Sequence, residues 1–194
     1  SFAVPEGSVF ALLGENGAGK TTAIRILLGL ADADEGKTEV LGLSSAAAGT
    51  EIRRRVGYVP EESDLYDWMR VDEIGWVAAG FYREGYYERY QKLIDAFHVP
   101  RDRKISALSK GMRAKVRLAI ALGHDPELLI LDEPTSGLDA IVRREFLESM
   151  VDRAATGRTV LLSSHQIHEV ERVADHVAII REGELIAVER LDAM

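Results

Sequence analysis

The sequence predicts an α/β protein with a mostly parallel β-sheet, because short apolar runs alternate along it with longer segments of helical spacing. Runs such as residues 9–13 and 128–131 contain no polar side chain, which is typical of strands covered on both faces. The segments between them carry apolar residues three and four positions apart. Strands that alternate with helices favour parallel pairing through right-handed crossovers.

The N-terminal elements follow in a fixed order. We expect a strand at residues 9–13, a Gly-rich turn at 14–19, a helix at 20–30, a short strand at 36–43, a helix at 51–55 and a strand at 56–59. Pro60 ends the last of these strands, since proline lacks the N–H that a central strand needs.

A small helical insert is predicted at residues 62–98, where nine of the 13 aromatic residues lie. Its apolar residues follow helical spacing, as in Ile74, Val77, Ala78 and Phe81. Nine aromatic side chains exceed what so small an interior should hold. We therefore expect core packing for some of them and an exposed apolar interface for others.

The remaining elements alternate regularly. A helix at 109–122 begins at a capping serine, and it is followed by a strand that ends at Asp132, a helix at 140–155, a strand at 159–163, a helix at 166–173 and strands near 177–180 and 185–188.

Composition excludes several classes of protein. The chain has 194 residues, 46% of them hydrophobic and 29% charged, which suits one domain with a real core. A net charge of −8 argues against a sequence-blind nucleic-acid binder, which needs a basic surface. The absence of cysteine excludes disulfides and thiolate chemistry. No apolar run approaches the roughly 20 residues that span a bilayer. The start lacks Met and signal-peptide features, so we expect the chain to begin partway into its domain.

A phosphate-binding loop is predicted between the first strand and the first helix. The segment Gly14-Glu15-Asn16-Gly17-Ala18-Gly19-Lys20-Thr21 fits G-x-x-x-x-G-K-[ST], and its glycines let backbone N–H groups approach phosphate oxygens. Lys20 would reach the β- and γ-phosphates, Thr21 would hold Mg²⁺ and Thr22 would touch the α-phosphate. The alternative is a Gly-rich turn of no special purpose, which the flanking strand and helix disfavour.

Two adjacent carboxylates end the strand at 128–132. Asp132 would bind Mg²⁺, through water, and Glu133 would orient and polarise an attacking water molecule. The alternative is an acidic pair at a helix N-terminus, which the dipole favours. Pro134 opposes an immediate helix and so disfavours this alternative.

One further motif resembles a particular family. Leu108-Ser109-Lys110-Gly111-Met112 opens a helix 20 residues before Asp132 and is similar to the signature motif of the ATP-binding cassette (ABC) superfamily. Other motifs of that family follow in order: a D-loop at 136–139, a switch histidine at His165 and a Q-loop at 58–61 with Glu61 in place of Gln. The resemblance covers essentially the whole chain.

The resemblance implies a phosphate-loop NTPase (RecA-like) fold in one domain at 1–194. Its core would comprise 1–61 and 123–194, with a helical signature subdomain at about 62–122. Usual N-terminal strands would be missing, among them one with an aromatic residue that stacks on adenine. This implies weaker and less base-selective nucleotide binding.

The resemblance also implies a mechanism. Such domains pair head to tail and hold ATP between the phosphate loop of one copy and the signature helix of the other. Ser109 and Gly111 would contact the partner's γ-phosphate, and Asp139 would bridge to the partner's phosphate loop. The catalytic set would be Lys20, Glu133 and His165, with His165 on the γ-phosphate and holding Glu133. Glu61 would join Thr21 and Asp132 at Mg²⁺.

Lys110 and Met112 depart from the usual Gly and Gln of the signature. Lys110 would either point to solvent, which we favour, or add charge near the partner's phosphate. Glu61 keeps an oxygen for metal or water and loses an amide donor. His165 and His168 are three residues apart, yet we expect His168 on an exposed helix face rather than in a metal pair.

Three functions remain open. The first is the ATPase subunit of a membrane transporter, of bacterial exporter style, at the cytoplasmic face of the membrane and beside a separate permease. In such transporters a groove beside the helical insert receives a permease helix, and Tyr66 and Trp68 would line it. The second is a soluble cassette protein acting on ribosomes, DNA or Fe–S assembly. The third is a binding module without turnover, against which intact Lys20, Asp132, Glu133 and His165 argue.

Overall fold

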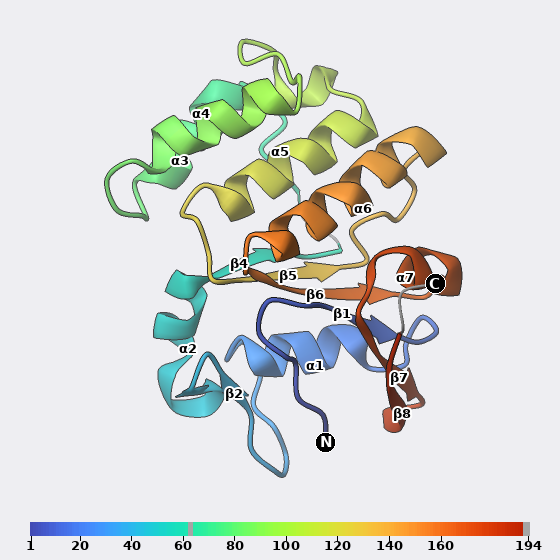
Figure 1. The fold of residues 1–194 in the computed structure, drawn as a ribbon. Coiled ribbons are helices and arrows are strands. Elements are labelled where there is room, and N and C mark those ends of the chain that lie inside the picture. The colour runs from blue at the N-terminus through green and yellow to red at the C-terminus, as the bar shows by residue number, and fades with distance from the viewer. Residues whose placement is uncertain (62–63, 192–194) are drawn as a thin grey trace.

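The computed structural model of the chain describes residues 1–61 and 64–191. A central β-sheet lies between two layers of helices, and a group of further helices packs beyond one of these layers (Figure 1). The alternation of strands and helices read from the sequence produces this layered arrangement.

The main sheet is mostly parallel, as predicted. Its strands lie in the order β4-β5-β6-β1-β7-β8, and every neighbouring pair is parallel except β7 with β8. The bounds are β1 (Val9–Leu13), β4 (Val56–Val59), β5 (Leu128–Asp132), β6 (Thr159–Ser164), β7 (His176–Arg181) and β8 (Glu184–Arg190).

The register brings three strand ends to one edge of the sheet. Leu13 of β1 pairs with Ser164 of β6, and Asp132 of β5 pairs with Ser163. All three strands therefore end at nearly the same level. Open α/β sheets bind ligands at this carboxyl edge.

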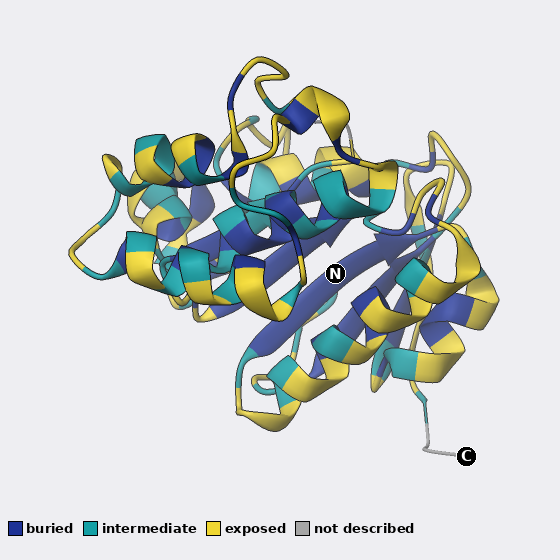
Figure 2. Cartoon of the chain, turned by 90° about the horizontal axis from the view of Figure 1, so that it is seen from above, coloured by how far each residue is buried: buried dark blue, intermediate teal, exposed yellow. Residues whose placement is uncertain are grey.

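Each face of the sheet is covered by its own helices. On one face lie α1 (Lys20–Leu27) and α2 (Ser45–Arg55), which contribute Ile24 and Ile52 to the core. On the other face lie α5 (Lys110–Leu122), α6 (Ala140–Ala155) and α7 (Ile167–Val173). Strands β1 and β5 are consequently buried on both sides (Figure 2), which explains their apolar sequences, whereas the edge strand β8 is largely exposed.

The predicted helical insert contains α3 (Val71–Ala79) and α4 (Tyr86–Ala96), and together with the short 3₁₀ helix Ile105–Ala107 that follows, it packs on α5. Tyr86 and Tyr90 are fully buried, and their hydroxyls donate to the carbonyls of Ile120 at 2.8 Å and Val71 at 2.6 Å. The Tyr90 ring fills the space where any side chain at Gly75 would lie. Aromatic residues thus form much of this smaller core.

Local backbone geometry accounts for the main differences from the expected elements. The strand expected at 36–43 is instead a hairpin of β2 (Glu39–Val40) and β3 (Leu43–Ser44), because Leu41 and Gly42 both adopt positive φ and form a tight turn. Helix α2 begins six residues earlier than expected and kinks at Ala48.

Within the residues described, no helix is both long and apolar enough to cross a membrane.

Candidate active site

The predicted phosphate loop joins β1 to α1 at the carboxyl edge of the sheet. Gly17 and Gly19 adopt positive φ values of 82° and 102°, a region that favours glycine. Gly14 packs so closely on the Ile180 carbonyl that a Cβ would collide with it, and its N–H donates to Ser164 O at 3.1 Å. The exposed residues Glu15 to Gly17 therefore lie on a loop held firmly at both ends.

Lys20 folds back over this loop. Its side chain is only 5% exposed, and Nζ donates to the carbonyls of Gly14 at 2.7 Å and Glu15 at 3.1 Å. The same ammonium lies 3.0 Å from Glu133 Oε1. Thr21 and Thr22, in the first turn of α1, are exposed. The helix start thus presents two hydroxyls and one buried cation at the loop.

Asp132 lies at the end of β5 and is fully buried. Its Oδ1 accepts a hydrogen bond from Ser163 Oγ at 2.5 Å, and that hydroxyl also accepts from Glu133 N at 2.9 Å. Asp132 Oδ2 is buried with no hydrogen-bond partner among the described residues. A buried carboxylate oxygen without a donor is costly and fits a cation or a metal-bound water.

Glu133 connects Lys20 to His165. Its side chain is 4% exposed, Oε1 pairs with Lys20, and Oε2 lies 2.8 Å from His165 Nδ1. Its φ of 46° is a left-handed conformation that costs about 1–3 kcal/mol for a residue other than glycine. Strain of this size is retained where the surroundings fix the residue, as the ion pair with Lys20, the contact with His165 and a backbone hydrogen bond do here.

Among the described residues, Glu61 forms no hydrogen bond or ion pair with Lys20, Glu133 or His165. It is exposed and, together with Glu133, Lys110 and Ser136, lines a pocket of about 490 Å³. The described part of the chain contains no cluster of three or more His, Cys, Asp or Glu side chains that could hold a metal ion. The buried Asp132 Oδ2, without a hydrogen-bond partner among the described residues, still suits Mg²⁺, which keeps several waters and takes one or two protein carboxylates.

The signature segment begins a helix whose tip is open. Ser109 is exposed and caps α5 by accepting from Met112 N at 3.2 Å. Gly111 lies against Val142 of α6, whose Cγ1 would be 3.0 Å from a Cβ at this position. The side chain of Lys110 is exposed and lies across Gly137 of the D-loop, so neither of the two expected positions describes it completely.

Asp139 has a structural partner within its own chain. Its Oδ1 accepts from the backbone N–H groups of Ile141 at 3.1 Å and Val142 at 3.0 Å, and so caps α6. Within the described residues, no hydrogen bond or ion pair joins Ser109, Gly111 or Asp139 to the Lys20–Glu133–His165 contact. The structure thus brings together the phosphate loop with Lys20, Glu133 and His165, and leaves Ser109, Gly111 and Asp139 outside this contact.

Tyr58, on β4, is half-buried near Asp132. Burial raises the pKa of its hydroxyl to about 12, the charge of Asp132 adds to this, and Arg25 opposes it. The phenol therefore stays neutral over any physiological pH. Tyr58 lies within the predicted Q-loop, but no role was predicted for its hydroxyl, nor for the buried side chains of Ser163 and Glu169.

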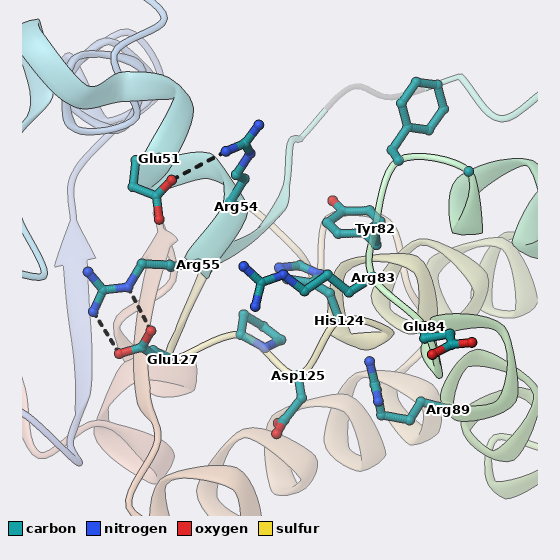
Figure 3. Close-up of a pocket in the computed structure, with 13 residues that line it drawn as sticks. Glu51, Arg54, Arg55, Tyr82, Arg83, Glu84, Arg89, His124, Asp125 and Glu127 are labelled. Carbon is teal, nitrogen blue, oxygen red and sulfur yellow. Dashed lines mark hydrogen bonds and ion pairs between the residues drawn. The ribbon is translucent and has the colours of Figure 1, made fainter.

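A second concavity of about 800 Å³ lies between the helical insert and the sheet (Figure 3). Tyr82 stacks on His124 at 4.5 Å, and Arg55 forms two hydrogen bonds with Glu127, at 2.7 and 2.8 Å. Tyr66 and Trp68, expected in such a groove, are exposed but lie outside its lining. The aromatic residues in the groove lining are instead Phe81, which is 82% exposed, and Tyr82. Both lie in the segment that follows the C-terminal end of α3.

Comparison with known proteins points to one family. The family model described as ABC transporter matches residues 1–136. An uncharacterized ABC transporter ATP-binding protein of Nostoc is 37% identical over 201 residues, covering all of this chain and 59% of the relative. The Nod factor export ATP-binding protein I of Neorhizobium galegae is 38% identical over 193 residues, covering 96% of this chain and 55% of the relative. The chain therefore spans less than two thirds of the length of these relatives.

A solved structure described as the ATP-binding subunit of an ABC transporter is also similar. It superposes with a TM-score of 0.87 at 34% sequence identity, over 98% of this chain and 82% of the other. The likeness extends across both the sheet and the helical insert.

Proposed function

The chain belongs to the ABC transporter family, and on that premise we propose that it binds and hydrolyses ATP as the energy-coupling subunit of a membrane transporter. The observation that carries this proposal is the contact of Lys20, Glu133 and His165 beside the phosphate loop. These groups supply a cation for phosphate, an acceptor for the proton of water and a side chain that orients the acceptor.

Nucleotide binding would use the loop between β1 and α1. Backbone N–H groups of residues 14–19 and the start of α1 would surround the phosphates, and Lys20 would exchange Glu133 for the β- and γ-phosphate oxygens. Because Lys20 is already at the loop, this exchange needs a change of partner rather than a long movement.

Asp132 Oδ2 and the Thr21 hydroxyl are the groups that would hold Mg²⁺, with Glu61 as a further candidate. When bound, Mg²⁺ would supply a positive charge that screens the phosphate oxygens. Ser163 fixes the orientation of Asp132 by donating to its other oxygen, so only Oδ2 is left for the metal or its water.

Hydrolysis would depend on Glu133. Freed from Lys20, its carboxylate would orient and polarise the attacking water molecule, while His165 keeps it aligned and contacts the γ-phosphate. His165 is 38% exposed, so it lies at the opening of the site where a γ-phosphate can reach it.

A second copy or a related cassette would complete the site. The exposed tip of α5 would place Ser109 and the Gly111 N–H on the partner's γ-phosphate, and Asp139 would approach the partner's phosphate loop. The single domain would then act as two parts, a core at 1–61 and 123–194 and a helical subdomain at about 62–122.

Coupling to transport would occur at the groove of Figure 3, which would receive a cytoplasmic helix of a separate permease. The exposed Phe81 and the stacked Tyr82 give this groove an apolar side, as a helix-binding surface needs. The protein would accordingly lie at the cytoplasmic face of the membrane. Export is favoured because a 38% identical relative is a Nod factor export protein.

The test is ATP hydrolysis by the full-length protein that contains this chain, purified with and without its permease. We expect vanadate-sensitive hydrolysis that Glu133→Gln reduces by about 10²–10⁴-fold, the usual contribution of general acid–base catalysis. Equal hydrolysis by the parent protein and this variant would exclude Glu133 from the role, and no hydrolysis by the parent would refute the function.

A further inference from the structure

Glu169 is a buried carboxylate that the proposed chemistry does not use. It lies in the first turn of α7 and is 2% exposed, although most of that helix's surface faces solvent. A buried charge is costly unless it is paired and hydrogen-bonded, so its neighbours indicate its purpose.

The carboxylate accepts from two hydroxyl groups of different segments. Its Oε2 accepts from Thr135 Oγ1 at 2.7 Å and from Ser164 Oγ at 3.2 Å. The Ser164 hydroxyl in turn accepts from Gln166 N at 3.0 Å. One oxygen thus joins the turn that follows β5 to the end of β6.

The other oxygen faces a guanidinium from α6. Glu169 Oε1 lies 3.3 Å from Arg143 Nε, and this arginine also donates from Nη2 to Leu138 O at 3.1 Å and from Nη1 to Gln166 Oε1 at 3.3 Å. Leu138 belongs to the D-loop. Arg143 therefore connects the buried carboxylate to the segment that precedes Asp139.

Each of these attachments is close in sequence to a residue of the proposed site. Thr135 is two residues after Glu133, Ser164 immediately precedes His165, and Leu138 immediately precedes Asp139. A displacement of any one of these segments would therefore be transmitted to the other two through Glu169 and Arg143.

We propose that Glu169 and Arg143 are positioning residues that hold Glu133, His165 and the D-loop in register, so that the position of the D-loop at the partner interface sets the geometry for hydrolysis. This inference rests on the proposed function. An acid favoured only by the dipole of α7 would need neither the buried hydroxyls nor Arg143.

Glu169→Gln separates these two roles in the full-length protein. The amide has nearly the volume of the carboxylate and keeps an oxygen for a hydroxyl donor, but it loses the charge that attracts Arg143. We expect kcat for ATP to fall about tenfold or more, because small misplacements of catalytic groups have large effects. The KM for ATP should change less than about twofold, since the phosphate-loop contacts remain.

Arg143→Gln should have the same effect from the other side of the pair. If both residues act through one connection, the double variant should be no slower than either single variant, because coupled groups are not additive. Arg143 is partly exposed, so its replacement keeps the test available even if Glu169→Gln does not fold.

Glu145→Gln is the matched control. Glu145 lies on the same helix α6 and pairs with Lys115 of α5 at 2.9 Å, which makes it an interhelical salt bridge outside the proposed connection. Its loss should leave kcat within about twofold of the parent, as expected for an exposed pair.

Selective loss of kcat in both single variants, with a non-additive double variant, would support the inference. Parent-like kcat in a folded Glu169→Gln or Arg143→Gln protein would overturn it, as would parallel losses of kcat, ATP affinity and melting temperature. Absence of hydrolysis by the parent would overturn the proposed function and this inference together, so the two failures are distinguishable.

Discussion

Replacing Glu133 by Gln should strengthen ATP binding even as it stops hydrolysis. In the structure the Glu133 carboxylate forms an ion pair with the ammonium group of Lys20. The phosphates of ATP would have to bind this same ammonium group. The neutral amide gives up this pairing while keeping the size of the side chain. Binding and turnover should therefore respond in opposite directions.

The geometry sets the size of the effect. At a separation of 3.0 Å and an effective dielectric constant near 20, the Coulomb attraction between the two groups is about 5 kcal/mol. Desolvation and the carbonyl partners of Lys20 offset part of it, and a hydrogen bond with charged groups has a net value of about 1.5–3 kcal/mol. Loss of this competing interaction should tighten ATP binding by roughly 10- to 100-fold.

The assay is calorimetric titration of Mg-ATP into the parent and the Glu133→Gln protein, with single-turnover hydrolysis measured in parallel. Glu15→Gln is the control for net charge, because the Glu15 side chain is exposed on the phosphate loop while only its backbone carbonyl contacts Lys20. It should tighten binding far less. Equal or weaker affinity in Glu133→Gln would refute the idea that the carboxylate competes with phosphate for Lys20.

Substitutions at three other positions test single features. Ser109→Ala should lose the α5 cap and lower the free energy of unfolding by about 1 kcal/mol. Ser109→Asp should keep the cap and the melting temperature but abolish ATP-dependent dimerisation, as measured by size-exclusion chromatography. A dimeric Ser109→Asp protein would contradict the proposed contact. Glu182→Asn should raise the melting temperature by about 1–4 °C, because Glu182 and Gly183 form a two-residue turn with positive φ that Asn tolerates better. An unchanged or lower melting temperature would contradict this explanation. Burial lowers the pKa of His124, so the unfolded chain binds more protons and stability is lost as pH falls below about 6.5. His124→Phe should therefore reduce the difference in melting temperature between pH 7.5 and 5.5. An equal difference in the parent and the variant would show that His124 is not the cause of this pH dependence.

The sequence was most informative where function depends on consecutive residues. The phosphate loop and the strand ending in Asp132 and Glu133 could be located because short segments determine their backbone form and their chemistry. The fully buried strands were recognisable for a similar reason, since covering on both faces removes the polar alternation.

Contacts between distant segments could not be read in the same way. Nothing in the local sequence indicates that Lys20 pairs with Glu133, or that Ser163 serves both members of the acidic pair. The same limit applies to Tyr66 and Trp68, because helical spacing predicts which residues share a face but does not show which loop closes a groove. No prediction was made from the sequence for Glu169, because its burial and its contacts with Thr135 and Ser164 join segments that are separate in the sequence.

The strained backbone at Glu133 explains how two adjacent carboxylates can have different tasks. In a regular strand, Asp132 and Glu133 would point to opposite faces of the sheet, each of which is covered by helices. The left-handed turn at Glu133 ends the strand and lets the carboxylate lie between Lys20 and His165, while Asp132 keeps its place in the ladder with Ser163. Because Ser163 binds the N–H of one residue and the carboxylate of the other, the strain at Glu133 and the orientation of Asp132 are fixed by the same hydroxyl.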